Sequence, residues 1–321
     1  MYNQPRVSAV RSIQGRGSVD RHSSRGDGRS PPIRQDYMET IPLLPLARAE
    51  IEGTQTSFLA DLFAGRPKAS QACVGSALVE RVLAGGYPEV LSRTSWTRRH
   101  AWFRSYLDAI IKRDVADVAD LARLVEMPRL VAALGHQAGQ LLNFSGAGSA
   151  IGLSHVTTAR YTRVLEELFL IRILPAWHHN RLKRLVKTPK LHFMDSGLLA
   201  ALRDLTPEQI TANRTSFGPV LETFVVSEIL KQASWSEPLQ LFHYRDKEGD
   251  EVDLILLSER GQLAGIEVKA SATVQAADFD GLRKFAAAAK QQFRAGVVLY
   301  DGEKVIPFGE KLFAVPIAAL W

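Results

Sequence analysis

Three carboxylates and one lysine near the end of the sequence have the residue types needed for phosphodiester chemistry. They are Glu222, Asp253, Glu267 and Lys269. Carboxylate oxygens are the ligands that Mg²⁺ prefers. A bound Mg²⁺ can activate water and neutralise charge on phosphorus, and a nearby lysine can orient that water. We therefore expect Glu222, Asp253 and Glu267 to be metal ligands, and Asp253, Glu267 and Lys269 to be catalytic.

Glu222 lies in a stretch that predicts a helix over residues 217–233. Its neighbours one helical turn away include Pro219, Val225 and Val226, so its carboxylate lies on an apolar stripe. A carboxylate buried in such a place needs a partner. Glu228, beside Lys231 and Gln232, is expected to be solvated instead.

The other three residues lie on two predicted strands, 251–257 and 263–269. Fourteen residues separate Asp253 from Glu267, with a turn at Gly261 between them, so a hairpin would align the two. Glu267 and Lys269 are two residues apart and should project from the same face. A strand at 239–244, a helix at 276–292 and a strand at 296–300 complete this predicted unit.

Residues 126–204 predict a winged helix-turn-helix. A helix at 128–140, a short helical piece at 149–153 and a second helix at 155–168, capped by Ser154, precede strands at 169–175 and 190–194. In such a module the second helix enters the major groove and the ribbon contacts phosphates. The expected DNA contacts are therefore Thr157, Thr158, Arg160, Arg163, Arg181, Lys183 and Arg184. The alternative is that the same fold mediates protein contacts.

The remaining sequence and the overall composition indicate what surrounds these predicted units and where the protein is expected to be found. The first 36 residues hold seven arginines, no lysine and no apolar period, which predicts a disordered basic tail over 1–37. An amphipathic pattern over 96–118 indicates a helical bundle. The net charge of +6 permits an anionic partner such as DNA. The single cysteine, Cys73, excludes an intramolecular disulfide. With no apolar run of roughly 18 residues and no secretory signal, we expect a cytoplasmic protein without a membrane span.

Several motifs together resemble a known family. An acidic helix, then Asp253, then Glu267-Val268-Lys269 follows the order of the PD-(D/E)xK nuclease superfamily. Residues 38–46, 85–89, 190–198 and 218–224 resemble prokaryotic AAA-superfamily ATPases whose C-terminal part is domain of unknown function 4143. That resemblance implies a P-loop ATPase, a helical lid, a winged helix and a nuclease-like domain.

The chain lacks the G-x-x-x-x-G-K-[ST] motif, so no ATP binding is expected. We expect an α/β multidomain protein. Residues 38–125 would be a remnant of the ATPase edge and helical lid, 126–204 the winged helix-turn-helix, and 205–321 a restriction-endonuclease-like α/β domain. A truncated or frameshifted gene would explain this organisation. Two functions stay open: a DNA-associated, Mg²⁺-dependent phosphodiesterase, or a non-catalytic module that binds DNA or protein.

Overall fold

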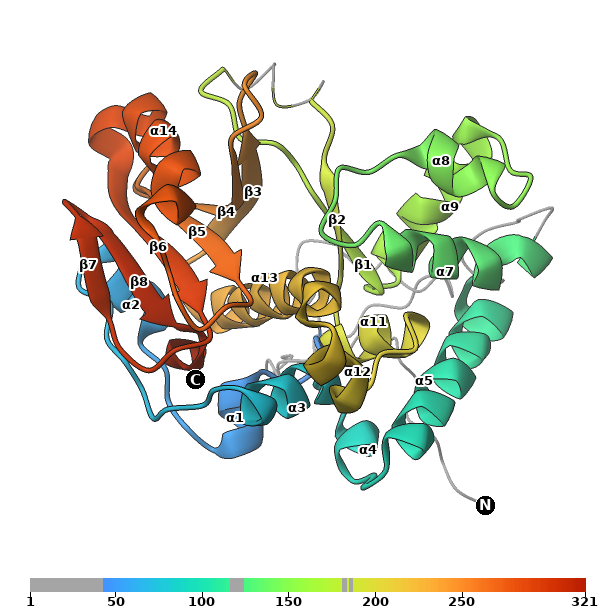
Figure 1. Cartoon of the computed structure of the whole chain (residues 1–321). Coiled ribbons are helices and arrows are strands. Elements are labelled where there is room, and N and C mark those ends of the chain that lie inside the picture. The colour runs from blue at the N-terminus through green and yellow to red at the C-terminus, as the bar shows by residue number, and fades with distance from the viewer. Residues whose placement is uncertain (1–42, 116–123, 181–183, 185–186) are drawn as a thin grey trace, which may run out of the picture. The chain divides into compact units, whose positions relative to one another are not determined.

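The structure is a computed structural model that describes residues 43–115, 124–180, 184 and 187–321 (Figure 1). Residues Pro45–Trp321 form one compact unit. The predicted basic tail, 1–37, lies outside the described residues, as do two of the expected DNA contacts, Arg181 and Lys183.

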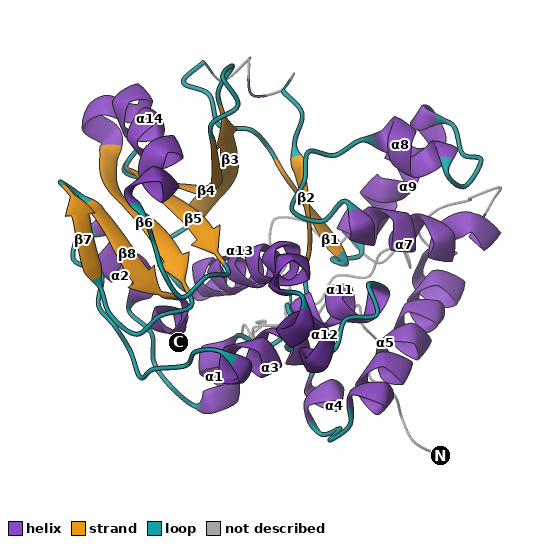
Figure 2. Cartoon of the chain, viewed as in Figure 1, coloured by secondary structure: helices purple, strands orange, loops and turns teal. Residues whose placement is uncertain are grey.

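A six-stranded mixed sheet forms the C-terminal part (Figure 2). Its strand order is β3-β4-β5-β6-β8-β7. The first three strands form an antiparallel meander, β6 and β8 continue parallel to β5, and β7 pairs antiparallel with β8. The bounds are β3 Leu239–Arg245, β4 Glu251–Ser258, β5 Leu263–Lys269, β6 Phe293–Tyr300, β7 Ile306–Gly309 and β8 Leu312–Pro316. The predicted hairpin between Asp253 and Glu267 is thus present.

Helices cover both faces of this sheet, which explains why β4 and β6 are apolar without alternation. Helix α14, Asp280–Ala289, packs on one face against β4, β5 and β6. Helices α13, Gly218–Trp235, and α2, Phe58–Phe63, pack on the other (Figure 1). The residues of α13 are buried around nearly its whole circumference, as expected of a helix enclosed by protein.

Helices from earlier in the chain pack against α13 or against one another. The amphipathic pattern over 96–118 forms helix α5, Trp96–Ile110, followed by one π-helical turn, Ile111–Val115. The other helices here are α1 Arg48–Glu52, α3 Ser76–Ala84, α4 Pro88–Leu91, α11 Ser196–Leu202 and α12 Pro207–Ala212. One continuous apolar core runs through these helices, α13 and the sheet.

A group of helices and a two-stranded ribbon, within residues 127–193, come between α5 and α11 in the sequence. The elements are α7 Met127–His136, α8 Phe144–Ser149, α9 His155–Glu167, β1 Ile171–Leu174 and β2 Lys190–Phe193. Ser154 caps α9 as predicted, because its side chain accepts a hydrogen bond from the Thr157 amide. The short helix begins earlier than the predicted 149–153, since Asn143 caps it by accepting from the Gly146 amide.

The chain that follows β1 pairs directly with the C-terminal sheet. The His243 amide donates to the Pro175 carbonyl at 3.0 Å, and the Trp177 amide donates to the His243 carbonyl at 2.6 Å. These bonds cover the edge of β3, which would otherwise present unpaired backbone groups. They also hold the β1–β2 ribbon close to the sheet.

Gly86 lies very close to the backbone of Leu46, and replacing this glycine tests the packing between the two segments. A Cβ at Gly86 would lie 2.2 Å from the Leu46 carbonyl oxygen, which cannot move as a side chain can. We expect Gly86→Ala to lower the free energy of unfolding by about 1–3 kcal/mol through overpacking. The matched control is Gly218→Ala. A Cβ there meets nothing within 4 Å, and the backbone φ is −47°.

The expected result for Gly218→Ala is unchanged stability or a gain of up to about 1 kcal/mol. Urea unfolding followed by circular dichroism measures both variants. Equal stability of the two alanine variants would contradict the close approach at Gly86.

Candidate functional site

The predicted acidic residues meet where β4, β5 and α13 come together with the start of β2. The backbone register pairs Leu254 with Ile266, so Asp253 and Glu267 are neighbours on adjacent strands. Asp253 Oδ2 accepts a hydrogen bond from the Val268 amide at 3.0 Å. Glu267 Oε1 lies 3.2 Å from Lys269 Nζ, which confirms that these two side chains share a face.

An irregularity in β4 accompanies Asp253. Phe242 pairs with Ile255 and Tyr244 pairs with Val252, so β4 has one residue more than β3 over this interval. Such a bulge re-aims side chains and is frequent beside functional sites. Asp253 lies within the bulge.

The sequence reasoning did not predict the central residue of this cluster, Lys190. It is the first residue of β2, and its side chain is only 3% exposed. Its Nζ lies 3.0 Å from Asp253 Oδ1, 3.1 Å from Glu222 Oε1 and 3.5 Å from Glu251 Oε2. Lys190 is therefore the partner that Glu222 requires. The available signal was a lysine at the start of a strand whose every residue is buried.

The acidic groups have pKa values displaced in opposite directions. Burial and the charge of Asp253 raise the pKa of Glu222 well above its usual value. The same two causes raise the pKa of Glu267 to about 8, despite the attraction of Lys269. Burial also tends to raise the pKa of Asp253, but the charge and hydrogen bond of Lys190 outweigh it, so that pKa is lowered. Lys190 thus favours the ionised form of Asp253, whereas burial disfavours that of Glu222 and Glu267.

Two buried histidines flank the cluster. His192 Nε2 lies 3.7 Å from Glu222 Oε1, and burial together with Lys190 lowers the pKa of His192 to about 3. His243 Nε2 lies 3.1 Å from the Thr188 carbonyl oxygen, and the same two causes lower the pKa of His243 to about 4. Both imidazoles are therefore neutral at pH 7.

The oxygens of this cluster are mostly committed to the chain itself. Glu222 and Asp253 each direct an oxygen at the Lys190 ammonium, where a metal bridging them would have to lie. As arranged, they fit a buried ammonium and not Mg²⁺. Among the described residues, no three His, Cys, Asp or Glu side chains converge as a metal site. Glu267 Oε2 differs, since it is buried without a hydrogen-bond partner in the described part of the chain.

Helix α9 presents only some of the expected DNA contacts. Arg160 and Arg163 are exposed and Thr157 is half-buried. Thr158 is fully buried, and its hydroxyl donates to the Ser154 carbonyl at 2.9 Å, so the prediction that it lies on the exposed side is wrong. The reason is helical phase, because Thr158 shares its face with the buried residues Tyr161 and Thr162.

Arg184 lies against the C-terminal sheet. Its guanidinium lies 4.8 Å from the Phe242 ring centroid and 5.9 Å from the Trp177 ring centroid. Its Nε donates to the His178 carbonyl at 2.6 Å. Both aromatic rings belong to the junction between the ribbon and β3, so Arg184 contributes to that junction.

Glu228 is buried, and the expectation that it is solvated is wrong. It pairs with Lys231 at 2.9 Å and accepts a hydrogen bond from the Arg48 amide at 2.7 Å. The Lys231 ammonium also donates to the Leu46 carbonyl at 3.0 Å. The segment around residues 46–48 therefore covers a face of α13 that local sequence would leave open.

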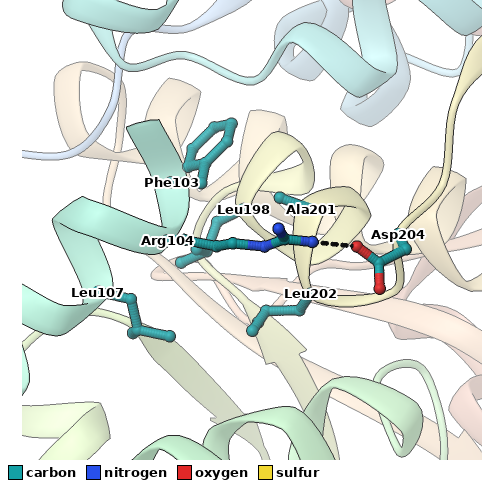
Figure 3. A pocket seen from close by; sticks show the side chains of 7 residues that line it. All are labelled: Phe103, Arg104, Leu107, Leu198, Ala201, Leu202 and Asp204. Carbon is teal, nitrogen blue, oxygen red and sulfur yellow. Dashed lines mark hydrogen bonds and ion pairs between the residues drawn. The ribbon is translucent and has the colours of Figure 1, made fainter. Parts of the chain in front are cut away.

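A separate small cavity lies between α5 and α11. It encloses about 120 Å³ and is lined mainly by Phe103, Leu107, Leu198, Ala201 and Leu202. The Arg104–Asp204 ion pair, at 2.5 Å, lies beside it (Figure 3). The acidic-lysine cluster contributes no residue to this cavity.

Comparisons with known proteins match two parts of the chain to families without an assigned role. Residues 75–209 match "Domain of unknown function (DUF8612)", and residues 217–320 match "Domain of unknown function (DUF4143)". The second match confirms the resemblance of the C-terminal part to domain 4143. No solved structure matches the chain significantly. No helix in the described ranges is long and apolar enough to cross a bilayer.

Two curated mycobacterial proteins are similar to the chain. They are "Uncharacterized protein Rv2008c" of Mycobacterium tuberculosis and "Uncharacterized protein Mb2031c" of Mycobacterium bovis. Each is 27% identical over 244 residues, which is 76% of this chain and 54% of the relative. The chain therefore spans about half the length of these relatives.

Proposed function

We propose that this chain is a DNA-associated protein that binds duplex DNA through α9. The observation that carries the proposal is an exposed basic stripe on that helix. Val156, Arg160 and Arg163 are all exposed and occur at i, i+4 and i+7, so they lie on one side of the helix. Arginines contact phosphates and guanine edges, and an apolar side chain can contact a thymine methyl group.

The surroundings of α9 support this role. The helix follows α8 through a tight turn, starts at a side-chain cap and is followed by the two-stranded ribbon β1–β2. That order of elements is typical of a winged helix-turn-helix. Its two acidic residues, Glu166 and Glu167, are confined to the last turn. The first turns of α9 are therefore free of the negative charge that would repel phosphate.

Fluorescence anisotropy with a labelled duplex at several salt concentrations tests the proposal. The logarithm of the binding constant falls linearly with the logarithm of the salt concentration. Each lost phosphate contact reduces the steepness of this line by about one. Arg160→Ala/Arg163→Ala should therefore reduce that slope by about two and weaken binding. The matched control is Arg294→Ala, which removes an exposed arginine from β6.

The control variant should bind as the unaltered chain does. Equal loss in both variants would indicate nonspecific charge, and undiminished binding by the double variant would exclude α9. A well-folded chain that binds no duplex would favour the alternative, a protein-binding module. We also propose that the chain is related to the AAA-superfamily proteins that it resembles. In this proposal it does not bind ATP through a P-loop.

A second candidate function is a metal-dependent phosphodiesterase. It is favoured by Glu267 Oε2, which is beside Lys269 and Asp253 and has no hydrogen-bond partner among the residues that the structure describes. A divalent ion would supply an activated water. The chain would supply Glu267 as an oxygen ligand and Lys269 as a charge near the phosphate. As the carboxylates stand, this role requires Lys190 to leave Asp253.

Plasmid and single-stranded DNA incubated with Mg²⁺ or Mn²⁺ test this candidate. Glu267→Gln/Lys269→Met is the matched inactive variant. It removes the proposed oxygen ligand and the nearby positive charge but leaves the ion pair between Asp253 and Lys190 intact. Cleavage by the unaltered chain that is lost in the variant would establish an enzyme. Equal cleavage in both preparations would point to a contaminant.

A further inference from the structure

We propose that the Lys190 ammonium is the resident cation of the Glu222–Asp253–Glu251 cluster, and that it excludes divalent metal from these carboxylates. Lys190 is then the residue that sets which cation the cluster holds. This role of Lys190 does not depend on DNA binding by α9.

The geometry at the ammonium matches its bonding capacity. An ammonium has three N–H donors. Lys190 Nζ has three carboxylates around it, at 3.0 Å from Asp253, 3.1 Å from Glu222 and 3.5 Å from Glu251. They come from α13 and from the start of β4. The ammonium thus fills the position from which one cation can contact all three.

The backbone of β2 holds Lys190 in this position from both sides. Lys190 pairs with Leu174 of β1, and on its other side it forms a bridge with Leu141. The flanking Leu191 amide donates to the Gln140 carbonyl at 3.2 Å. In the same segment, which also bonds to Leu191 through the Gly139 amide, a Cβ at Gly139 would lie 2.9 Å from Glu222 Oε2, so this glycine leaves room for the carboxylate. The lysine is built into the site.

A divalent ion would compete with this ammonium for the same oxygens. Mg²⁺ binds oxygens at about 2.0–2.1 Å and demands near-octahedral geometry. An ion at that distance from both Asp253 Oδ1 and Glu222 Oε1 would lie next to the ammonium, and the two positive charges would repel each other. The other lysine, Lys269, does not block these oxygens, since it pairs with Glu267 and Asp278.

Removing the ammonium would leave a site that suits a divalent ion. Glu222 and Asp253 would face one another without the ammonium between them, while Glu251 would keep its ion pair with Arg245. Two buried atoms nearby have no hydrogen-bond partner within the described residues, Glu267 Oε2 and His192 Nε2. An oxygen and an imidazole nitrogen are both ligands for Mn²⁺-type ions. We therefore expect these side chains to bind a divalent ion only once the Lys190 ammonium is removed.

The test is Mn²⁺ binding by Lys190→Met, which keeps the apolar stem and removes the charge. Titration calorimetry and the Mn²⁺ electron paramagnetic resonance signal measure the affinity for Mn²⁺. Thermal unfolding with and without Mn²⁺ measures how much the bound ion stabilises the folded state. We expect Lys190→Met to bind Mn²⁺ at least about tenfold more tightly than the unaltered chain. Its unfolding temperature should also rise more with Mn²⁺.

Two further variants make the result specific. Lys231→Met removes a second buried lysine, which pairs with Glu228 and not with this cluster in the described part of the chain, and should bind Mn²⁺ as the unaltered chain does. Lys190→Met/Glu222→Gln removes one carboxylate from the vacated site and should lose most of the gained affinity.

The inference is wrong if folded Lys190→Met binds Mn²⁺ no more tightly than Lys231→Met. If Lys190→Met does not fold alone, Mn²⁺ must restore its circular dichroism spectrum, and failure to do so overturns the inference equally. These readouts involve no nucleic acid, so a failure of the DNA-binding proposal leaves them unaffected.

Discussion

Asp253→Ala should lower the free energy of unfolding by about 3–5 kcal/mol, because it breaks a buried ion pair by removing one partner. The carboxylate accepts from the Lys190 ammonium and from the Val268 amide, at 3.0 Å each. Alanine leaves the amide without its acceptor and the ammonium with two carboxylates in place of three. Urea unfolding followed by tryptophan fluorescence gives the measurement.

Two controls separate charge from packing. Asp253→Asn keeps an acceptor for the Val268 amide and should be less destabilising than alanine. Glu237→Ala breaks an ion pair with Arg260 whose side chains are 65% and 72% exposed, and it should cost under about 1 kcal/mol. If Asp253→Ala and Glu237→Ala cost the same, the Lys190 cluster does not stabilise the fold.

Acidification should destabilise the fold through the buried imidazoles of His192 and His243, whose pKa values are both lowered. His192 is the one that lies beside Glu222. Its pKa is lowered from the ordinary 6.5 to about 3, because burial and the nearby Lys190 charge oppose protonation. Between these two values the unfolded chain binds a proton that the folded chain does not, so this contribution to stability falls as pH falls. At pH 5 the loss is about 2 kcal/mol.

Other groups in the cluster titrate in the opposite sense. The raised pKa of Glu267, about 8, means that the folded state binds a proton before the unfolded state does. Its contribution is present below pH 4.5 and is lost as pH rises through 8, so acidification from pH 7 favours folding there. The pH dependence of the total free energy of unfolding is therefore the sum of opposing contributions. The contribution of His192 has to be measured by comparison with a variant that lacks this imidazole.

The stability of His192→Gln relative to the unaltered chain provides that comparison. It should improve by about 2 kcal/mol from pH 7 to pH 5. Between pH 8 and pH 9 the difference should stay constant, because neither the folded nor the unfolded imidazole titrates there. Urea unfolding at these four pH values gives the measurement. A difference that is the same at pH 5 and pH 7 would show that His192 becomes charged in the folded protein.

Local sequence predicted much of the secondary structure. The apolar runs at 251–257 and 263–269 gave β4 and β5, and the side-chain period of two placed Glu267 and Lys269 on one face. Ser154 predicted the start of α9. These features depend on residues close together in the chain, where periodicity and capping act directly.

Tertiary structure decided what surrounds those side chains. Lys190 is 32 residues from Glu222 and 63 from Asp253, and it reaches them because the chain that follows β1 pairs with β3 and holds the ribbon close to the sheet. Glu228 is buried by a segment 180 residues away. No local pattern encodes such contacts, since they form only when distant segments pack together. By itself the sequence thus determined which elements carry Glu222, Asp253, Glu267 and Lys269. Long-range packing decided that a buried lysine, arriving from another part of the chain, neutralises two of these four residues.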